Sequence, residues 1–193
     1  MSRNDRPNQS RYILVIALTI ILFISFFIWW NSYRHIANKP SSLASIIQLL
    51  SSHELTHQAK GREGLRALGD GKVPVSLFTH EQPLVRLNAF VVSVTSELSP
   101  IPDEALALFH DTSSQVRETT VAYYGRLQNR LPPGTLLTYA KDPVASVRFS
   151  LAQEIQIGQI RGQEALDALK ILINDSDPAV AKTAKTALRK FTM

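Results

Sequence analysis

One long apolar run dominates the hydropathy pattern of the chain. Residues 12–30 (YILVIALTIILFISFFIWW) contain no charged side chain. A helix of that length rises roughly 28 Å at about 1.5 Å per residue, close to the thickness of the hydrocarbon core of a bilayer. Trp29, Trp30 and Tyr33 stand at the far end of the run, where aromatic rings favour the membrane interface. The pattern therefore predicts a single transmembrane helix over residues 12–30.

A cleaved signal peptide is the competing interpretation of this run. Its apolar core would be about 7–15 residues long and would lead to small residues at a cleavage site. The run here is longer and ends in WWNSYR, so an uncleaved anchor fits better. Three arginines in the short basic tail, residues 1–11, precede the run, whereas one arginine and one lysine follow it closely. The positive-inside rule then predicts a single-pass protein of the cytoplasmic (inner) membrane, with residues 31–193 on the periplasmic or extracytoplasmic side.

Beyond residue 41, apolar residues recur with a constant period, typical of repeat proteins. A Val-Arg pair marks each copy, and the pairs Val85-Arg86, Val116-Arg117 and Val147-Arg148 follow one another at equal steps. Val180 continues the series after a slightly longer step. The residues four positions after these valines are small or apolar: Ala89, Thr120, Leu151 and Ala184. The residues seven and eight positions before them are Leu77-Phe78, Leu108-Phe109, Tyr139-Ala140 and Leu172-Ile173. Such spacings predict two amphipathic helices in each copy.

Turn-forming residues separate the two predicted helices of each copy. Asp111, Asp142 and Asp175 stand five positions before their valines, where a helix N-cap is expected. Pro143 and Pro178 follow at positions suited to a first helical turn. The unit is therefore a helix, a short turn and a second helix. Several units must stack, because one pair cannot bury its apolar face alone.

The same frame extends to an N-terminal copy. Leu55 stands nearly one full period before Val85, so we expect it to be a core residue. Residues 43–50 are then the first helix of this copy. His53 and His57 are expected one helical turn apart near the start of the second helix, on a partly exposed face.

The repeated pattern resembles HEAT repeats, and its short period resembles the HEAT-like repeats of phycobilisome lyases. The family's D-P-x-V-R-x-x-A signature is matched in part by DPVASVRFSLA, residues 142–152. The resemblance implies an all-α fold, a right-handed α-solenoid of about five HEAT-like helix pairs over residues 42–193, with residues 31–41 as a spacer after the membrane helix. In such families, recurring aspartates and arginines form a ladder between neighbouring repeats. By resemblance, the ladder here would consist of Arg86, Arg117, Arg148, Asp111, Asp142 and Asp175.

The pentapeptide HELTH at residues 53–57 matches the H-E-x-x-H zinc motif of thermolysin-like metallopeptidases. On a helix, His53 and His57 would share a face that binds zinc, and Glu54 would act as general base toward a bound water. A catalytic zinc also needs a third protein ligand, and the sequence after the motif selects none. A match of this length arises by chance in about one such chain in a hundred or two. We therefore predict no catalytic residue and no bound metal, with this zinc site as the alternative interpretation.

Charge and composition bear on the class of partner. The formal net charge is +5, but residues 31–193 carry 18 basic and 15 acidic side chains, a net +3. That charge is too small and too scattered to predict nucleic-acid binding. The chain contains no cysteine, so no disulfide framework indicates its compartment.

An anchor followed by a repeat domain predicts a scaffold or adaptor rather than an enzyme. It would bind a protein partner at the membrane surface and assist its assembly or tethering, without a cofactor. A membrane-bound zinc peptidase is one alternative, and a lyase or chaperone-like factor for a cofactor-bearing partner is another. The last predicted helix is basic toward its end, with Lys182, Lys185, Arg189 and Lys190. These residues suit the helix dipole and a solvated terminal repeat, and contact with anionic lipid or an acidic partner is the functional alternative.

Overall fold

A computed structural model of the chain describes residues 20–30, 42–68, 72–96 and 101–191. The chain divides into two compact units, Met1–Pro40 and Ser41–Met193. The described residues are helical and contain no strand, which confirms the predicted all-α class. The expected repeat domain, residues 42–193, lies within the second unit.

The first unit contributes one described helix, at residues 20–30, whose side chains are exposed. The tail at 1–11, the first part of the predicted transmembrane helix at 12–19 and the spacer at 31–41 lie outside the described residues. Within the described part of the chain, no helix is both long enough and apolar enough to cross a membrane.

The second unit is built from short helices. In chain order these are α2 (Leu43–Leu50), α3 (Leu55–Ala67), η1 (Val75–Leu77), α4 (Pro83–Thr95), α5 (Asp103–Ala107), η2 (Leu108–His110), α6 (Ser114–Ala122), α7 (Tyr124–Leu127), η3 (Gln128–Arg130), α8 (Thr135–Ala140), α9 (Ala145–Gln156), α10 (Gln163–Leu172) and α11 (Pro178–Phe191). The first helix predicted for residues 43–50 is therefore present with those bounds. The helix expected around Leu77 is a single 3-10 turn, because Pro74 disfavours helix before it and the next turn follows at once.

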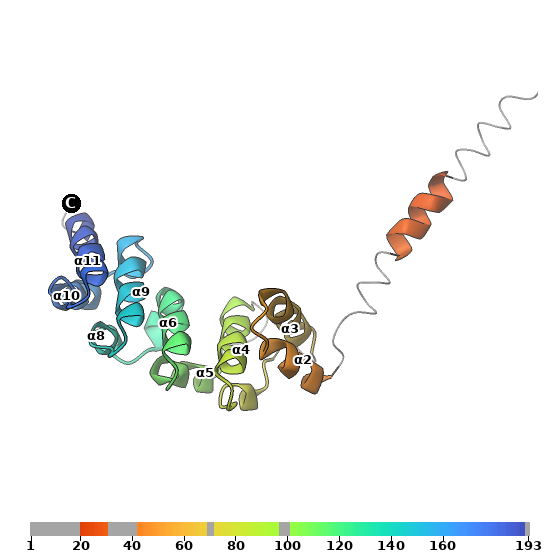
Figure 1. Ribbon diagram of the computed structural model, residues 1–193, viewed down its shortest axis with the longest axis horizontal. Coiled ribbons are helices and arrows are strands. Elements are labelled where there is room, and N and C mark those ends of the chain that lie inside the picture. Colours follow the sequence, from red (N-terminus) through yellow and green to blue (C-terminus); the bar gives the residue numbers. More distant parts are fainter. Residues whose placement is uncertain (1–19, 31–41, 69–71, 97–100, 192–193) are drawn as a thin grey trace, which may run out of the picture. The chain divides into compact units, whose positions relative to one another are not determined.

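The longer helices of the second unit pack side by side in chain order. α4 packs against α3 and α6, and α9 packs against α6 and α11 (Figure 1). The element that precedes each of these helices in the chain pairs with it: α2 with α3, η1 with α4, η2 with α6, α8 with α9 and α10 with α11. Each helix of the series thus contacts its own partner element and the neighbouring helices of the series.

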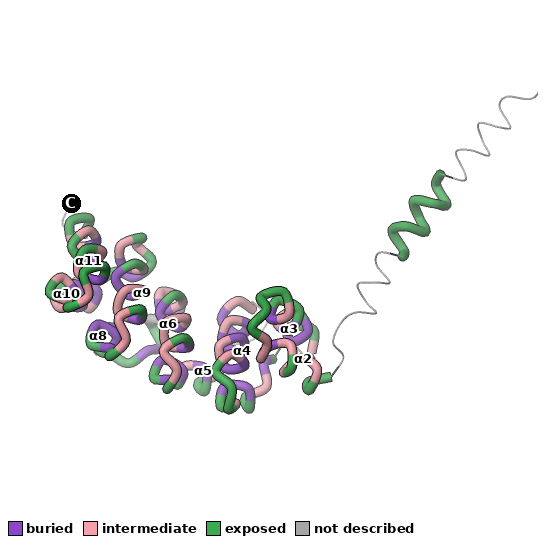
Figure 2. Tube along the Cα trace, in the orientation of Figure 1, coloured by how far each residue is buried: buried purple, intermediate pink, exposed green. Residues whose placement is uncertain are grey.

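Buried apolar side chains of the second unit form one cluster. Buried positions recur along the helices from α2 to α11 (Figure 2). Val85, Val116, Val147 and Val180 are at most 1% exposed, and the four residues placed one turn after them are fully buried. The pairs seven and eight positions before each valine also face the core, all buried except the half-buried Ile173. The predicted period therefore identified the interior of these four copies.

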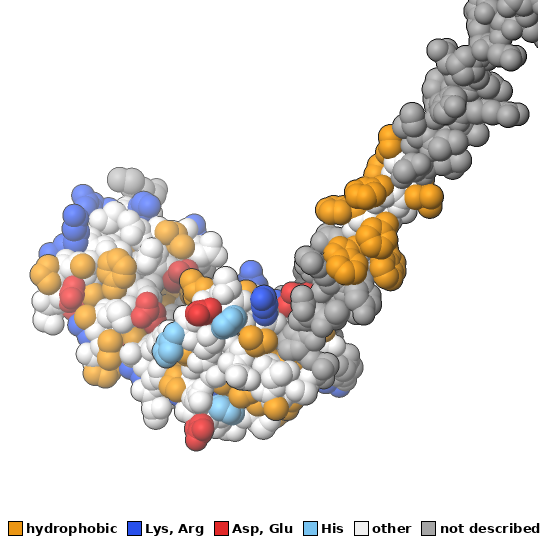
Figure 3. Space-filling model, turned by 45° about the vertical axis from the view of Figure 1, so that its right-hand side comes forward, with side chains coloured by type: hydrophobic (Ala, Val, Ile, Leu, Met, Phe, Trp, Pro, Cys, Tyr) orange, Lys and Arg blue, Asp and Glu red, His pale blue; other side chains and the backbone are white. Residues whose placement is uncertain are grey.

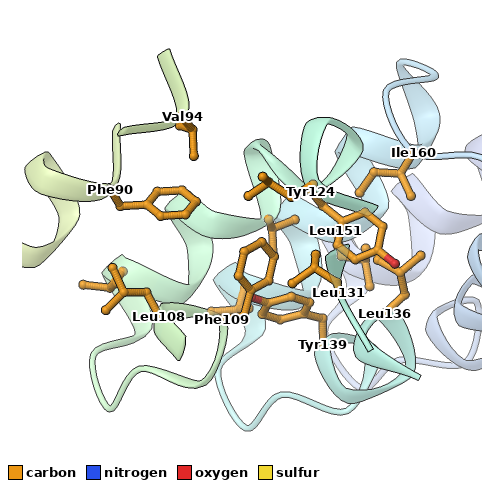
Figure 4. Packing of buried hydrophobic residues seen from close by; sticks show 14 of the residues in the cluster. Phe90, Val94, Leu108, Phe109, Tyr124, Leu131, Leu136, Tyr139, Leu151 and Ile160 are labelled. Atoms are coloured by element: carbon orange, nitrogen blue, oxygen red, sulfur yellow. The ribbon is translucent and has the colours of Figure 1, made fainter. Parts of the chain in front are cut away.

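Aromatic rings link neighbouring copies at the centre of the core. The ring centroid of Phe109 lies 6.1 Å from that of Phe90, 6.3 Å from Tyr124 and 5.9 Å from Tyr139 (Figure 4). Edge-to-face and tilted contacts at these distances are favourable beyond the area that they bury. The Tyr139 hydroxyl is hydrogen-bonded to Thr120 at 2.7 Å, and burial raises the pKa of Tyr139. The buried Tyr139 hydroxyl therefore has a hydrogen-bond partner within the core.

The N-terminal copy departs from the predicted frame. Leu55, expected in the core, is 76% exposed. Gly61 takes the position of Ala89 instead, so the step from α3 to α4 is shorter than the predicted one. At Gly61, α3 approaches α2 so closely that an added Cβ would lie 2.8 Å from Leu50. The prediction for Leu55 was wrong because a glycine, not an apolar side chain, marks the contact. The buried residues of α3 are Gln58, Gly61, Gly64 and Leu65.

Candidate functional site

Five turns between short and long helices share one hydrogen bond. At each turn, a polar side chain accepts a hydrogen bond from the backbone N–H two residues later, at 2.7 to 3.1 Å. The accepting residues are Ser52, His80, Asp111, Asp142 and Asp175. The aspartates therefore lie two residues before the helix N-caps, which are Ser113, Val144 and, from its bonds to two backbone N–H groups, Asp177. Their predicted N-cap position was wrong by that distance, because the carboxylates close the turns instead.

Arginine–aspartate pairs join successive copies at these turns. Arg86 donates from Nε and Nη2 to Asp111, each at 2.7 Å. Arg117 makes the same two bonds to Asp142 at 2.7 and 2.9 Å, and Arg148 makes them to Asp175 at 2.6 and 2.8 Å. The arginine side chains are 11–13% exposed and the aspartates 4–6%. The six residues expected to form a ladder thus form three bidentate, largely buried ion pairs.

The third nitrogen of each arginine ties it to its own copy. Nη1 donates to the backbone carbonyl six residues earlier: His80 for Arg86, Asp111 for Arg117 and Asp142 for Arg148, at 2.6 to 2.7 Å. Each guanidinium therefore holds one turn with Nη1 and the following turn with Nε and Nη2. This planar fork of donors is available from arginine but not from lysine.

The ladder also sets the protonation of its carboxyl groups. For Asp142, burial acts to raise the pKa, but hydrogen bonds from Arg117 and the Val144 N–H, with the charges of Arg117 and Arg148, bring the pKa below its ordinary value. For Asp175, the hydrogen bond from Arg148 lowers the pKa against the opposing effect of burial. The hydrogen bonds that Arg117 and Arg148 donate to these aspartates correspondingly raise the pKa values of the two arginines. The Arg117–Asp142 and Arg148–Asp175 pairs are therefore ionised at neutral pH.

The first junction replaces the ion pair with neutral amides. Gln58 takes the arginine position, since its Nε2 donates to the carbonyl of Ser52 six residues earlier, at 2.8 Å. The buried Asn88 then bridges the copies, donating to the carbonyl of Leu50 at 3.1 Å and accepting from Arg62. Sequence reasoning missed these residues because it followed the Val-Arg pair, which this copy lacks. A polar residue two positions before each helix cap is the signal that would have found Ser52 and His80.

The HELTH segment does not present a helical pair of histidines. α3 begins at Leu55, with Glu54 as its N-cap, so His53 precedes the helix. His57 Nδ1 lies 3.2 Å from Ser52 Oγ, and His57 Nε2 lies 3.4 Å from Glu54 Oε2. The expectation of two histidines one turn apart on α3 was therefore wrong. Residues 51–54 form the turn between α2 and α3, and that turn has the same hydrogen bond as the four others.

Zinc binding by this segment would rest on His53 and His57 as ligands, with Glu54 as the general base. Both ring nitrogens of His57 already face protein side chains. Among the residues that the structure describes, no group of three or more His, Cys, Asp and Glu side chains is placed to hold a metal ion.

Comparison of the chain with protein-family models, with curated proteins and with solved structures found no match.

Proposed function

We propose that residues 42–193 form a right-handed α-solenoid of five HEAT-like helix pairs, and that the protein is a membrane-anchored scaffold. It would bind a protein partner at the membrane surface and assist its assembly or tethering. The observation that carries this proposal is the repeated junction, in which Arg86–Asp111, Arg117–Asp142 and Arg148–Asp175 join successive copies in one geometry.

A repeated junction of this kind supports a structural role for the ladder. Each arginine donates from Nη1 to a backbone carbonyl of one turn and from Nε and Nη2 to the aspartate of the next turn. Little of its side chain is therefore exposed to solvent. Copies linked in this way contact only their neighbours, and arrays of this type expose extended surfaces suited to holding proteins or peptides. Surface complementarity is sufficient for such a function, without catalytic chemistry.

The proposed anchor rests on the sequence of residues 12–30. A long uncharged run with aromatic side chains at one end favours a single membrane pass. Tethering would confine the repeat domain to a layer near the membrane, which raises its effective concentration toward partners held there.

Crosslinking in intact cells, followed by affinity purification of the tagged full chain and mass spectrometry, tests the scaffold. We expect a reproducible protein partner, and we expect Arg117→Ala with Arg148→Ala to reduce its recovery because the stacked surface is distorted. Lys60→Ala, a change at an exposed position of α3, is the matched control and should leave recovery unchanged. Recovery of background proteins alone would contradict the proposal. Trapping of membrane proteins by Glu54→Gln would instead favour the peptidase alternative.

A further inference from the structure

A groove lies beside Ile157, at the edge of the second unit where α9 and α11 end. Two hollows, of about 430 and 380 Å³, both have Ile157 in their lining. The larger one is also lined by Arg161, Lys190 and Phe191, and the smaller one by Tyr123, Arg126 and Glu154. Ile157 is the residue that the two linings share, so the hollows lie on either side of it, and we refer to them together as the groove.

The backbone presents Ile157 outward in a fixed geometry. α9 ends in a glycine C-cap motif, in which the Gly158 N–H donates to the carbonyl of Ile155 and the Gln159 N–H to that of Glu154, both at 3.0 Å. Gly158 has φ of +82°, which other residues rarely adopt. The motif leaves the Ile157 side chain 57% exposed. An exposed isoleucine held this way needs little further ordering when it is covered by a ligand.

The walls of the groove are also packed closely. Gly125 of α7 approaches the backbone carbonyl of Gln159 so closely that any added Cβ would collide with it. The Arg161 guanidinium is held across the end of α9, because its Nε donates to the carbonyl of Gly158 at 3.1 Å. The groove is therefore part of the packed unit.

Cations outnumber carboxylates in the lining of this groove. Arg126, Arg161 and Lys190 are exposed cations, and Glu154 is the single acidic residue among the lining side chains. Arg126 lies over the ring of Tyr123 at 5.8 Å and donates to the carbonyl of Val94, while Lys190 lies 3.5 Å from the carbonyl of Gln156. Burial raises the pKa of Glu154. Further exposed Lys and Arg side chains gather on α11 nearby, at the C-terminal end of the unit (Figure 3).

We propose that this groove binds an acidic peptide segment in which an apolar side chain is flanked by carboxylates. The apolar side chain would cover Ile157, and the carboxylates would reach Arg126 on one side and Arg161 with Lys190 on the other. This inference deepens the proposed scaffold function and rests on it, since it names the chemistry of the partner. A peptide fits better than an anionic membrane surface, because the hollows divide around a single side chain that one apolar residue of a peptide can cover.

Selection of random displayed peptides on the full chain, kept in a neutral detergent, tests the groove. We expect enrichment of peptides with an apolar residue between acidic ones. A labelled synthetic copy of an enriched peptide should bind about tenfold or more weakly to Ile157→Asp and to Arg161→Glu with Lys190→Glu. Leu55→Asp and Lys60→Glu are matched controls, since they place the same changes on exposed positions of α3. Unchanged melting temperatures would show that the variants remain folded.

Several outcomes would overturn the assignment. Enriched peptides without excess acidic residues, no enrichment at all, or equal weakening by the α3 controls would each contradict it. If the charge reversals instead reduce crosslinking of the chain to phosphatidylglycerol in mixed phosphatidylglycerol and phosphatidylcholine nanodiscs, while no acidic peptide is enriched, the groove faces lipid. A cellular partner whose recovery is unaffected by Ile157→Asp would leave the scaffold in place and remove this groove from it.

Discussion

Arg117 donates two hydrogen bonds to the carboxylate of Asp142, from Nε at 2.7 Å and from Nη2 at 2.9 Å. The two residues are 25 positions apart and belong to successive helix pairs. Nη1 of the same arginine reaches back to the carbonyl of Asp111 at 2.7 Å. One side chain therefore connects two turns, and the pair lies in the middle of the ladder, with equivalent pairs on both sides.

Removing Arg117 should destabilise the repeat domain strongly. Arg117→Ala leaves the 6% exposed carboxylate of Asp142 without its partner, and we expect a loss of about 3 kcal/mol in the free energy of unfolding. Urea unfolding of the full chain in neutral detergent, followed by circular dichroism, measures this loss. Lys60→Ala is the surface control, with an expected change within about 0.5 kcal/mol. Equal stability of Arg117→Ala and the unchanged protein would show that the pair is not structural.

Acid should weaken the ladder in a defined direction. The pKa of Asp142 and that of Asp175 are lower in the folded protein than the ordinary value of 3.8. Unfolding therefore takes up protons at acid pH, so the stabilisation is present above 3.8 and is lost as the pH falls through the lower folded-state values. Asp175→Asn removes one such group, and its free energy of unfolding should fall less steeply below 3.8. Parallel pH profiles for the two proteins would contradict this assignment.

The sequence pattern predicted the interior better than the junctions. Val116 and Leu151 were placed correctly because an apolar side chain at a fixed helical spacing has one stable location, the buried face. Leu55 was misplaced because α3 meets its neighbour through Gly61, and a glycine leaves no mark in a hydrophobic pattern. The groove at Ile157 was not predicted either, since the turn that exposes this residue depends on the positive φ of Gly158.

Zinc should not bind stoichiometrically at the HELTH segment. His53 lies before the first residue of α3, and His57 already contacts Ser52 and Glu54 through its two ring nitrogens. Helical presentation of both histidines, which zinc ligation by this motif requires, is therefore missing. Elemental analysis of the full chain purified with added zinc measures the metal content. A stoichiometric zinc that is lost in His57→Ala would refute this expectation, and His110→Ala, a change at another exposed histidine, is the control.

Completing the ladder at the first junction should couple two substitutions. Gln58 and His80 occupy the positions that arginine and aspartate occupy in the next three junctions, as their hydrogen bonds to Ser52 and from the Gln82 N–H show. His80→Asp alone adds a carboxylate without its cation, and Gln58→Arg alone adds a cation without its carboxylate, so each should be neutral or destabilising. The double variant introduces the bidentate pair. The change that it makes in the free energy of unfolding should therefore be more favourable than the sum of the two single changes, by about 1 kcal/mol or more.

A double-mutant cycle by urea unfolding measures this coupling. The same two substitutions made with Gln58→Lys in place of Gln58→Arg are the matched control, because lysine brings the charge without the planar fork that reaches both a carboxylate and a backbone carbonyl. We expect the lysine cycle to show less than half of the coupling. If the arginine and lysine cycles agree, charge alone accounts for the junction, and the bidentate geometry of Arg86, Arg117 and Arg148 is not what joins the copies.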